Sequence, residues 1–352
     1  MNAPFVMTGD GLALADPHDP AQAARIDGFA AERGATPFHR PAWLCAVERG
    51  TGQRALGILA RRRGQIAGWL PLTEVHSPIF GRALVSSGFG VGGGILSADG
   101  ETAQRLAAAA CELASRRSCP TVELRGGPVP AGWESRSDRH LGFVAELAAD
   151  DEAQLLAIPR KQRAEVRKSL AGDLAVRVGR GERERAAHYA VYCQSVHNLG
   201  TPVFPRSLFD AALDALEGDI LTVFDGESPV ASVLSFYHGG TVMPYWGGGT
   251  FAARRLRANE RMYYELMLHA RRRGCTRFDF GRSKTGSGPA AYKKNWGFTP
   301  EPLTYAHWSA PGSARRDIDP TNDSYSAKIV LWKRLPLSVA NRLGPPIARG
   351  LG

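Results

Sequence analysis

Residues 246–288 read WGGGTFAARRLRANERMYYELMLHARRRGCTRFDFGRSKTGSG and contain the pattern that decides the fold. Three glycines come first, an arginine-rich stretch with apolar residues at helical spacing follows, and a short aromatic segment comes last. Glycines are frequent in the turns between helices and strands, and apolar residues at helical spacing predict an amphipathic helix. The stretch therefore predicts a strand that ends in glycines, a long helix and a closing strand.

The same order of features occurs a second time, nearer the N-terminus. Gly92, Gly93 and Gly94 precede a helical stretch that ends in RRSCP and a strand VELRG, which parallel RRGCT and FDFGR in the later copy. Upstream, TPFHRPAWLCAV at residues 36–47 echoes TPVFPRSLFDAAL at residues 201–213. Self-similarity of this kind indicates a duplicated unit.

Each copy is expected to form a helix, two antiparallel strands, a third strand that ends in glycines, a long helix and a closing strand. The first two strands join at the turn sequences Arg63-Gly64 and Asp225-Gly226. The expected fold class is therefore α/β, with mixed α+β sheets, built as a tandem duplication. The expected ranges are an N-terminal domain at 1–158, a basic interdomain helix at 159–175, a C-terminal domain at 176–310 and a basic tail at 311–352.

The composition favours a cytoplasmic protein with anionic partners. The 352 residues include 44 lysines and arginines against 34 aspartates and glutamates, a net charge of +10. This excess favours nucleotides, RNA or an anionic membrane face, and an arginine-rich solvated surface is the alternative. Scattered cysteines and histidines predict neither a disulfide framework nor a metal site, and no apolar run is long enough to span a membrane. Residues 331–352, basic and apolar, either pack on the protein or lie on an anionic bilayer.

The glycines of the second copy predict an anion site. A strand that ends in glycines and leads into a helix exposes unpaired N–H groups at the positive end of the helix dipole, which can hold a phosphate or a carboxylate. Gly247, Gly248 and Gly249 would form this phosphate-binding site, and Arg254 and Arg255 would strengthen it. The first copy begins its helix with acidic residues, so we expect it to supply only a cleft wall. The alternative is that the glycines serve a tight turn.

The segment FDFGRSKTGSGPAAYKKNWGF, residues 278–298, gathers an acid and several cations around a Gly/Ser loop. In a strand, Asp279 points away from the apolar face that Phe278 and Phe280 form. Asp279 could orient an attacking amine or relay its proton, or it could pair with Arg282. The cations could neutralise the oxyanion and phosphates of an acyl donor. Transfer of an acyl group to an amine fits this set of residues.

These motifs, with TPVFPRSLF and PYWGGG, strongly resemble the FemAB-like proteins associated with exosortase/PEP-CTERM exopolysaccharide loci, within the GNAT-like N-acyltransferase superfamily. The resemblance implies two GNAT-like domains in one chain. It also implies transfer of an amino acid from aminoacyl-tRNA to an amine on a peptidoglycan precursor. The family's lysine in a Phe-Lys-x-x-Phe-Gly pattern matches YKKNWG, residues 292–297, and assigns a catalytic role to Lys293. The sequence departs from some tRNA-using members, which have a coiled-coil arm.

We therefore expect an N-acyltransferase acting on an amine of a cell-envelope saccharide or peptidoglycan-type precursor. Acyl-CoA or aminoacyl-tRNA would be the co-substrate, with no tightly bound cofactor. Lys293 would stabilise the oxyanion or a donor phosphate, and Asp279 would position or deprotonate the amine, in a positively charged hollow between the two halves. The expected substrate contacts are Arg282, Lys284, Lys294, Tyr245, Trp246 and Trp296. The alternative is a non-catalytic GNAT-like module that binds an anionic saccharide or lipid-linked precursor. With either function, the protein could make peripheral contact with the inner membrane face.

Overall fold

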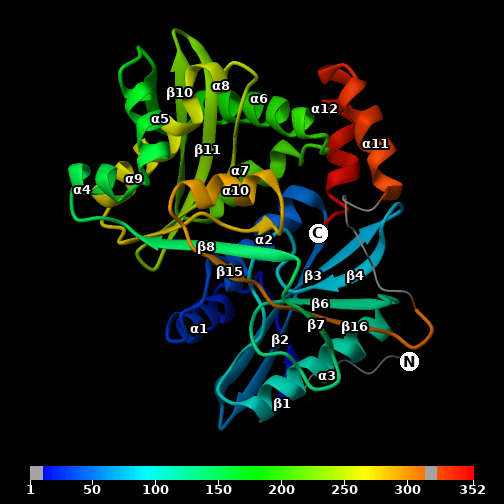
Figure 1. The fold of residues 1–352 in the computed structure, drawn as a ribbon. Coiled ribbons are helices and arrows are strands. Elements are labelled where there is room, and N and C mark those ends of the chain that lie inside the picture. Colours follow the sequence, from blue (N-terminus) through cyan, green and yellow to red (C-terminus); the bar gives the residue numbers. More distant parts are fainter. Residues whose placement is uncertain (1–10, 314–322) are drawn as a thin grey trace.

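The structure, a computed structural model, describes residues 11–313 and 323–352. Two α/β units lie one above the other in Figure 1, with the N-terminal half of the chain in the lower unit and most of the C-terminal half in the upper one. Each unit is built around one mixed sheet of eight strands. The predicted fold class, a tandem duplication in mixed α/β sheets, is confirmed.

The sheet of the lower unit begins with a long hairpin. Its two strands join at Arg63-Gly64, and both residues have a positive φ, which suits the tight turn of a twisted hairpin. β4 and β6 are parallel, so the helix between them crosses over one face of the sheet. In order across the sheet the strands are β1 (Gly11–Leu14), β2 (Arg54–Arg62), β3 (Gln65–Ser77), β4 (Gly81–Val85), β6 (Thr121–Arg125), β16 (Tyr305–Ser309) and β7 (Glu134–Arg136), with β5 (Leu96–Ser97) paired to β3.

The sheet of the upper unit repeats this plan. Its hairpin turns at Gly226, where φ is 58°, and its parallel pair is β12 with β13. In order the strands are β14 (Ser283–Lys284), β8 (His140–Glu146), β13 (Arg277–Asp279), β12 (Thr241–Gly249), β11 (Ser228–His238), β10 (Gly218–Asp225) and β9 (Ala175–Gly179), with β15 (Pro300–Pro302) paired to β8.

The two units exchange strands. β8 follows the lower unit in the chain but pairs with β13 in the upper sheet, and β16 follows the upper unit but pairs with β6 in the lower sheet. Figure 1 shows β8 at the boundary of the two units and β16 beside β6 in the lower unit. The exchange brings residues from both halves together where the sheets meet. The sheets therefore do not divide the chain at a single point, and the domain ranges given above remain a prediction.

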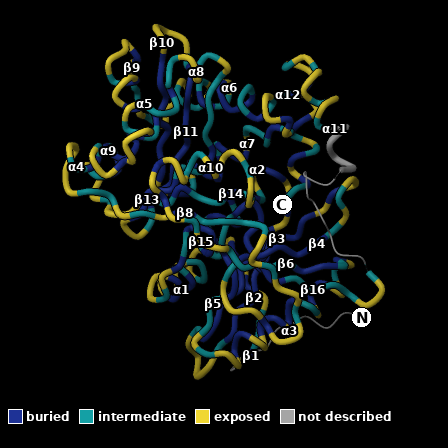
Figure 2. Tube along the Cα trace, viewed as in Figure 1, coloured by how far each residue is buried: buried dark blue, intermediate teal, exposed yellow. Residues whose placement is uncertain are grey.

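The two segments with matching sequences upstream of the hairpins form α2 and α7, which pack against each other between the units. The packing is close, because a Cβ at Gly50 would lie 2.4 Å from the Cα of Leu208. One hydrophobic cluster joins Trp43 of the lower unit to Trp246 of the upper unit. Figure 2 shows the buried trace continuing through both sheets. The helices are α1 (Pro20–Ala31), η1 (Pro37–His39), α2 (Pro41–Thr51), α3 (Gly100–Arg116), α4 (Asp151–Ala157), α5 (Arg160–Leu170), α6 (Glu182–Leu199), α7 (Arg206–Ala215), α8 (Ala253–Leu256), α9 (Ala258–Arg272), α10 (Gly288–Asn295), α11 (Asp323–Arg334) and α12 (Leu337–Ala348).

The glycine triplets differ between the copies. In the upper unit β12 ends at Gly249, as predicted. In the lower unit the prediction is wrong, because β4 ends at Val85 and Gly92–Gly94 lie in the loop that follows it. Packing explains why this loop needs glycine, since a Cβ at Gly94 would lie 1.9 Å from the carbonyl oxygen of Gly126. Within the described residues, no helix combines the length and apolar character needed to cross a bilayer.

Candidate active site

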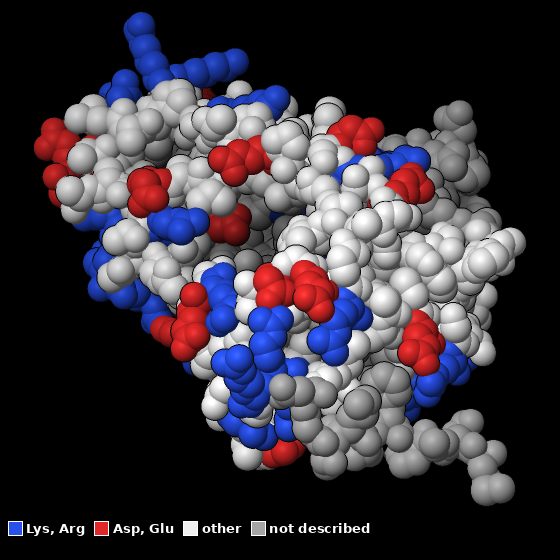
Figure 3. Space-filling model, turned by 90° about the horizontal axis from the view of Figure 1, so that it is seen from below, with Lys and Arg blue, Asp and Glu red and all other residues white. Residues whose placement is uncertain are grey.

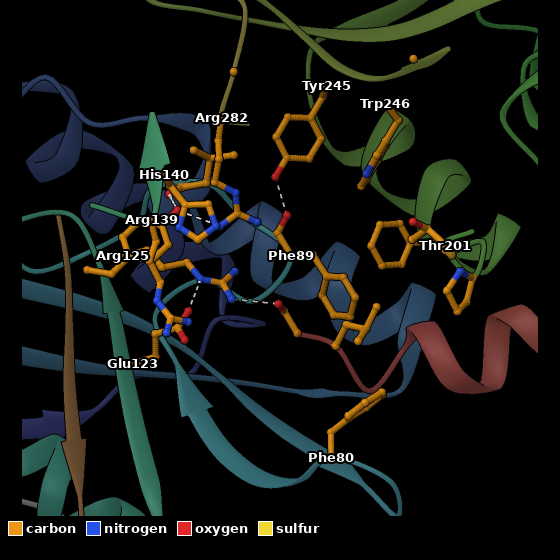
Figure 4. Close-up of a pocket in the computed structure, with 18 of the residues that line it drawn as sticks. Phe80, Phe89, Glu123, Arg125, Arg139, His140, Thr201, Tyr245, Trp246 and Arg282 are labelled. Atoms are coloured by element: carbon orange, nitrogen blue, oxygen red, sulfur yellow. Dashed lines mark hydrogen bonds and ion pairs between the residues drawn. The ribbon is translucent and has the colours of Figure 1, made fainter. Parts of the chain in front are cut away.

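A cavity of 890 Å³ lies where the two units meet, a volume typical of small-molecule sites. Both sheets, the exchanged strands and the C-terminal helices contribute to its walls. Figure 4 shows side chains from both halves of the chain converging on it. The polar and charged residues that line it include Glu123, Arg125, Arg136, Arg139, His140, Thr201, Tyr245, Tyr263, Arg282, Lys293, Tyr305 and His307. The lining therefore carries a clear excess of positive charge.

An arginine–glutamate pair from β6 forms part of the cavity wall. Arg125 is buried, with 5% of its surface exposed, and its Nε donates to Glu123 Oε1 over 2.7 Å. The two terminal nitrogens of Arg125 donate to the carbonyl oxygens of Gly90 and Gly352, each over 2.9 Å. Burial alone would raise the pKa of Glu123, but the charges of Arg125 and His307 lower it to about 2. Glu123 is therefore ionised at neutral pH.

Arg282 reaches the same cavity from the upper unit. It follows β13 and donates from Nη1 to the hydroxyl of Tyr305 over 2.8 Å, and that hydroxyl donates to the carbonyl oxygen of Val91 over 2.9 Å. His140, on the exchanged strand β8, lies beside it. Burial, followed by the charge of Arg282, lowers the pKa of His140 to about 4. The imidazole of His140 is therefore neutral at physiological pH.

Lys293 lies on α10 and lines the cavity close to Arg282. Its Nζ donates to the carbonyl oxygens of Gly281 and Arg282, each over 3.0 Å. An ammonium group has three N–H donors. Two of them have these partners within the described residues, and the third is left for a ligand. Burial lowers the pKa of Lys293 to about 8; the charge of Asp279 opposes this shift and that of Arg282 adds to it. Lys293 thus stays largely protonated at neutral pH but is poised near its titration.

Asp279 lies near Lys293 but is not among the residues that line the cavity. Its carboxylate accepts the backbone N–H of Gly281 over 2.9 Å. Burial raises the pKa of Asp279, against the opposing effects of that hydrogen bond and of Lys293. The geometry places Asp279 where it can influence Lys293 electrostatically, with the Gly281 peptide between the carboxylate and the ammonium group.

Aromatic residues shape the cavity next to the charges. Tyr245 donates its hydroxyl hydrogen to the carbonyl oxygen of Phe89, and burial raises its pKa. Trp246 is buried against it, with ring centroids 4.9 Å apart. Both residues line the cavity, as do Phe89 and Phe204. Tyr245 and Trp246, two of the expected substrate contacts, therefore lie on the cavity wall.

The predicted phosphate-binding residues are dispersed. Gly247 lines the cavity, whereas Gly248, Gly249, Arg254 and Arg255 do not, and both arginines are exposed. The short helix α8 and a left-handed residue separate the glycines from α9, so β12 does not lead directly into the long helix. In the lower unit the carboxylate of Asp99 caps α3 by accepting the backbone N–H of Thr102. An acidic side chain therefore occupies the N-terminus of this helix.

Close packing explains the glycine at position 248. A Cβ at Gly248 would lie 2.1 Å from Oγ and 2.6 Å from Cβ of Ser195 on α6. We expect Gly248→Ala to lower the free energy of unfolding by about 1–3 kcal/mol through overpacking. Urea denaturation measures the change. Gly226→Ala is no control because of its positive φ, so Gly288→Ala, where the new Cβ meets open space, provides the comparison. An unchanged stability for Gly248→Ala would show that this packing is not required.

The other predicted contacts fall outside the cavity. Lys284 lies on β14, Lys294 is exposed on α10, and Trp296 is buried in the hydrophobic cluster of the upper unit. None of the three lines the cavity. Helical geometry accounts for the difference between Lys293 and Lys294, because consecutive residues on a helix point in directions about 100° apart.

Sequence reasoning missed Glu123, Arg125, His140 and Tyr305. A signal for Glu123 was present, since the match of VELRG to FDFGR gives Glu123 and Asp279 equivalent positions in the repeat, whereas Arg125 matches Gly281. No local signal identified His140 or Tyr305, because their place in the cavity depends on the strand exchange. Among the described residues, no group of three or more His, Cys, Asp or Glu side chains is placed to hold a metal ion.

Comparisons with known proteins agree with this geometry. Residues 159–294 match the family described as acetyltransferase (GNAT) domain. Similar solved structures include FemX, with 14% identity over 81% of this chain and 95% of that chain, and a TM-score of 0.63. A tandem GNAT protein from the clavulanic acid biosynthesis pathway has 12% identity over 86% and 100% of the two chains, with a TM-score of 0.58. The C-terminal domain of a putative lysylphosphatidylglycerol synthetase from Agrobacterium fabrum has 12% identity over 82% and 92%, with a TM-score of 0.56.

No curated protein matches the sequence. At these identities, the likeness to solved structures concerns the fold alone. The family match covers the upper unit from α5 to α10, which contains Tyr245, Arg282 and Lys293. Residues 159–294 of this chain are therefore similar to GNAT acetyltransferase domains, and the fold of the chain as a whole is similar to that of a tandem GNAT protein.

Proposed function

We propose that this protein is a FemAB-like N-acyltransferase that transfers an aminoacyl or acyl group to an amine of a cell-envelope saccharide or peptidoglycan-type precursor. One observation carries the proposal: Lys293 of the GNAT-like domain shares a cavity with the buried Arg125 and the partly buried Arg282, which come from different units. The cavity is large enough for a substrate and has charges for its recognition and for the reaction. The link to exopolysaccharide biosynthesis rests on the sequence resemblance.

In this proposal Lys293 is the hydrogen-bond donor that stabilises the negative charge formed in the reaction. A neutral acceptor amine attacks the donor carbonyl, and the remaining N–H of Lys293 stabilises the oxyanion of the tetrahedral intermediate. The C–N bond forms in this addition, and the bond from the carbonyl carbon to the thiol sulfur of CoA, or to the ribose oxygen of tRNA, breaks when the intermediate collapses. The proton lost by the amine ends on the leaving group, directly or through water. Tyr245 and Trp246 bound the space in which the amine is held.

The two arginines support an anionic acceptor. A guanidinium group has five N–H donors, and Arg282 uses one of them for Tyr305 in the described structure. The fork of donors suits a carboxylate or phosphate. Burial strengthens such contacts because water does not compete for the donors. Precursors that carry a phosphate, pyrophosphate or carboxylate near the reactive amine therefore fit the cavity best.

The donor is a co-substrate in this proposal, either acyl-CoA or aminoacyl-tRNA. The exposed Arg254 and Arg255 beside α9 are available to its phosphates. Both donors are made in the cytoplasm, so we place the protein there, with peripheral contact to the inner membrane face. Asp279 acts in this proposal on Lys293, and Lys284 on β14 acts on the entering substrate, whereas Lys294 is exposed and takes no part.

Thermal unfolding with candidate donors tests the proposal. A ligand at about a hundred times its Kd adds roughly 2.7 kcal/mol to stability, which is readily measured. We expect stabilisation by acetyl-CoA or by aminoacyl-tRNA, and a further shift when an amine acceptor with an anionic group is added. Uncharged tRNA and free CoA are the matched controls. Stabilisation by saccharides alone, with neither donor binding, would contradict the transferase and favour a binding module.

The pH dependence of transfer tests the role of Lys293. Its protonated form is required to stabilise an oxyanion, and its pKa is about 8. We therefore expect kcat/KM to fall as the pH rises above about 8, and to fall at low pH where the acceptor amine is protonated. In Lys293→Arg the charge persists to high pH, so the alkaline fall attributed to this residue should disappear. An alkaline limb that is identical in Lys293→Arg would show that another group titrates.

Asp279 has a separate expected effect on the same profile. Its negative charge raises the pKa of Lys293, against the larger effect of burial. Asp279→Asn should therefore move the alkaline limb of kcat/KM to lower pH, because the ammonium group loses an opposing charge. If Asp279→Asn instead lowers the rate equally at every pH, Asp279 handles the proton of the acceptor directly.

A further inference from the structure

The last two helices leave a group of apolar side chains facing outward. α12 packs on the protein through Ala340, Gly344 and Ala348, which are buried and lie four residues apart. Four exposed apolar residues of α11 and α12 form what we call the C-terminal face, and the two helices lie at the right of Figure 1. They are Val330, Leu331, Val339 and Leu343, with 65% exposure at Leu331 and 48% at Leu343. Exposed apolar clusters of this kind mark surfaces with a partner.

The charged side chains of the segment that carries the C-terminal face, from residue 324 onward, are all basic. Lys333, Arg334, Arg342 and Arg349 are all exposed on or next to the two helices. The sequence has no aspartate or glutamate from residue 324 to residue 352. On the face that Figure 3 shows, several aspartate and glutamate side chains lie next to lysine and arginine side chains. The positive charge of the C-terminal face is therefore not balanced by neighbouring acids of its own segment.

The same helices form the apolar side of the cavity. Ile329, Trp332 and Ile347 line it together with the charged residues described above. The turn between β3 and β4 adds Ile79 and Phe80 to this wall, and Ile79 is 64% exposed. Exposed apolar surface and cavity lining thus lie on the same elements, so an amphiphile could have its head group at the arginines and its chain toward the outside.

We propose that the C-terminal face, together with Ile79, docks on an anionic bilayer and that the cavity opens toward this bilayer. Apolar side chains enter the interface, while lysines and arginines at their edge bind anionic head groups. The acceptor would then be a membrane-held amphiphile whose amine-bearing, anionic head group enters the cavity. This second step rests on the proposed acyl transfer, whereas the docking does not.

The mixture of side chains favours a bilayer over other partners. RNA binding uses cationic surfaces with stacking aromatics or polar groups, and the C-terminal face offers aliphatic side chains. A second copy of this chain would bring two positively charged faces together, which costs electrostatic energy. An anionic bilayer matches both the apolar and the charged parts of the surface.

Flotation of the full-length protein with lipid vesicles tests the docking. The probe is a vesicle of equal parts phosphatidylglycerol and phosphatidylcholine, compared with phosphatidylcholine alone. We expect the wild-type protein to float with the anionic vesicles and to be released by high salt. Leu331→Glu with Leu343→Glu should lower the bound fraction at least about tenfold, because two apolar contacts become repelled charges. The matched control is Leu156→Glu on α4, which replaces a leucine that is 53% exposed, and it should bind like the wild type.

Several outcomes would overturn the docking. They are absence of binding to anionic vesicles, equal binding by the double variant and the control, and a wild-type dimer that the double variant converts to monomer. Transfer to a short, water-soluble acceptor separates the two proposals. The double variant should retain this activity, because neither leucine lines the cavity. If the double variant loses vesicle binding but keeps this activity, the result bears on docking alone. If the wild-type protein has no activity on the soluble acceptor, the result bears on the transferase proposal alone.

Discussion

Lys293→Met is expected to lower kcat/KM for acyl transfer by about a hundredfold to a thousandfold, the usual cost of removing one donor from an oxyanion site. The reason is the position of the ammonium group, which is held by the carbonyl oxygens of Gly281 and Arg282 and has one N–H left for a ligand. Methionine has a similar length and no donor. Steady-state kinetics with a labelled donor measures the loss, and circular dichroism checks that the fold is retained.

The neighbouring lysine provides the matched control. Lys294 lies on the same helix, is exposed and does not line the cavity. Lys294→Met removes the same charge from the same helix, so we expect kcat/KM within about threefold of wild type, as for a surface charge. Equal losses in both variants would mean that the positive charge of α10 matters as a whole. In that case the specific contact assigned to Lys293 would be wrong.

Arg125→Met is expected to lower the free energy of unfolding by about 2–3 kcal/mol. It leaves Glu123 ionised without its partner at 2.7 Å, and breaking a fully buried pair costs roughly 3–5 kcal/mol. The value expected here is smaller because a quarter of the Glu123 side chain remains accessible. Urea unfolding at neutral pH measures the change, and Arg136→Met is the control. Its ion pair with Glu134 is largely exposed, so the expected cost is under about 1 kcal/mol.

The pH dependence of this effect has a defined sign. The pKa of Glu123 is lowered from 4.5 to about 2 in the folded protein, so its contribution to stability is present above about pH 4.5 and is lost as the pH falls toward 2. The stability difference between wild type and Arg125→Met should therefore shrink across this range. Adding Glu123→Gln to Arg125→Met should recover part of the stability at neutral pH. No recovery would mean that the arginine acts through its contacts with Gly90 and Gly352.

The repeated plan of the fold could be predicted because its signals are local. The turns at Arg63-Gly64 and Asp225-Gly226, the helical stripe after Gly249 and the matched closing strands each depend on a few neighbouring residues. The glycine triplet of the lower unit was assigned wrongly to a strand end. Glycine indicates either a turn or close packing, and only the structure shows that Gly94 lies against Gly126.

The site was predicted only in its upper half. Arg282 and Lys293 follow from motifs in one segment, and both line the cavity. The lower half depends on long-range pairing: β8 brings His140 next to Arg282, and β16 brings Tyr305 to hydrogen-bond with it. A sequence pattern contains no signal for such an exchange of strands between units. Charge alone was also a poor guide, since Lys294 and Arg255 share the sign of Lys293 but are exposed.

The central claim is that the cavity catalyses transfer to an anionic amine, and label transfer tests it most directly. The purified protein is incubated with a fraction of small anionic amines and either isotopically labelled acetyl-CoA or labelled aminoacyl-tRNA, and products are identified by mass spectrometry. The expected result is label in an amide of a negatively charged compound, formed by wild type and Lys294→Met and strongly reduced with Lys293→Met. Binding of such a compound without label transfer from either donor, or equal label with all three proteins, would contradict the claim.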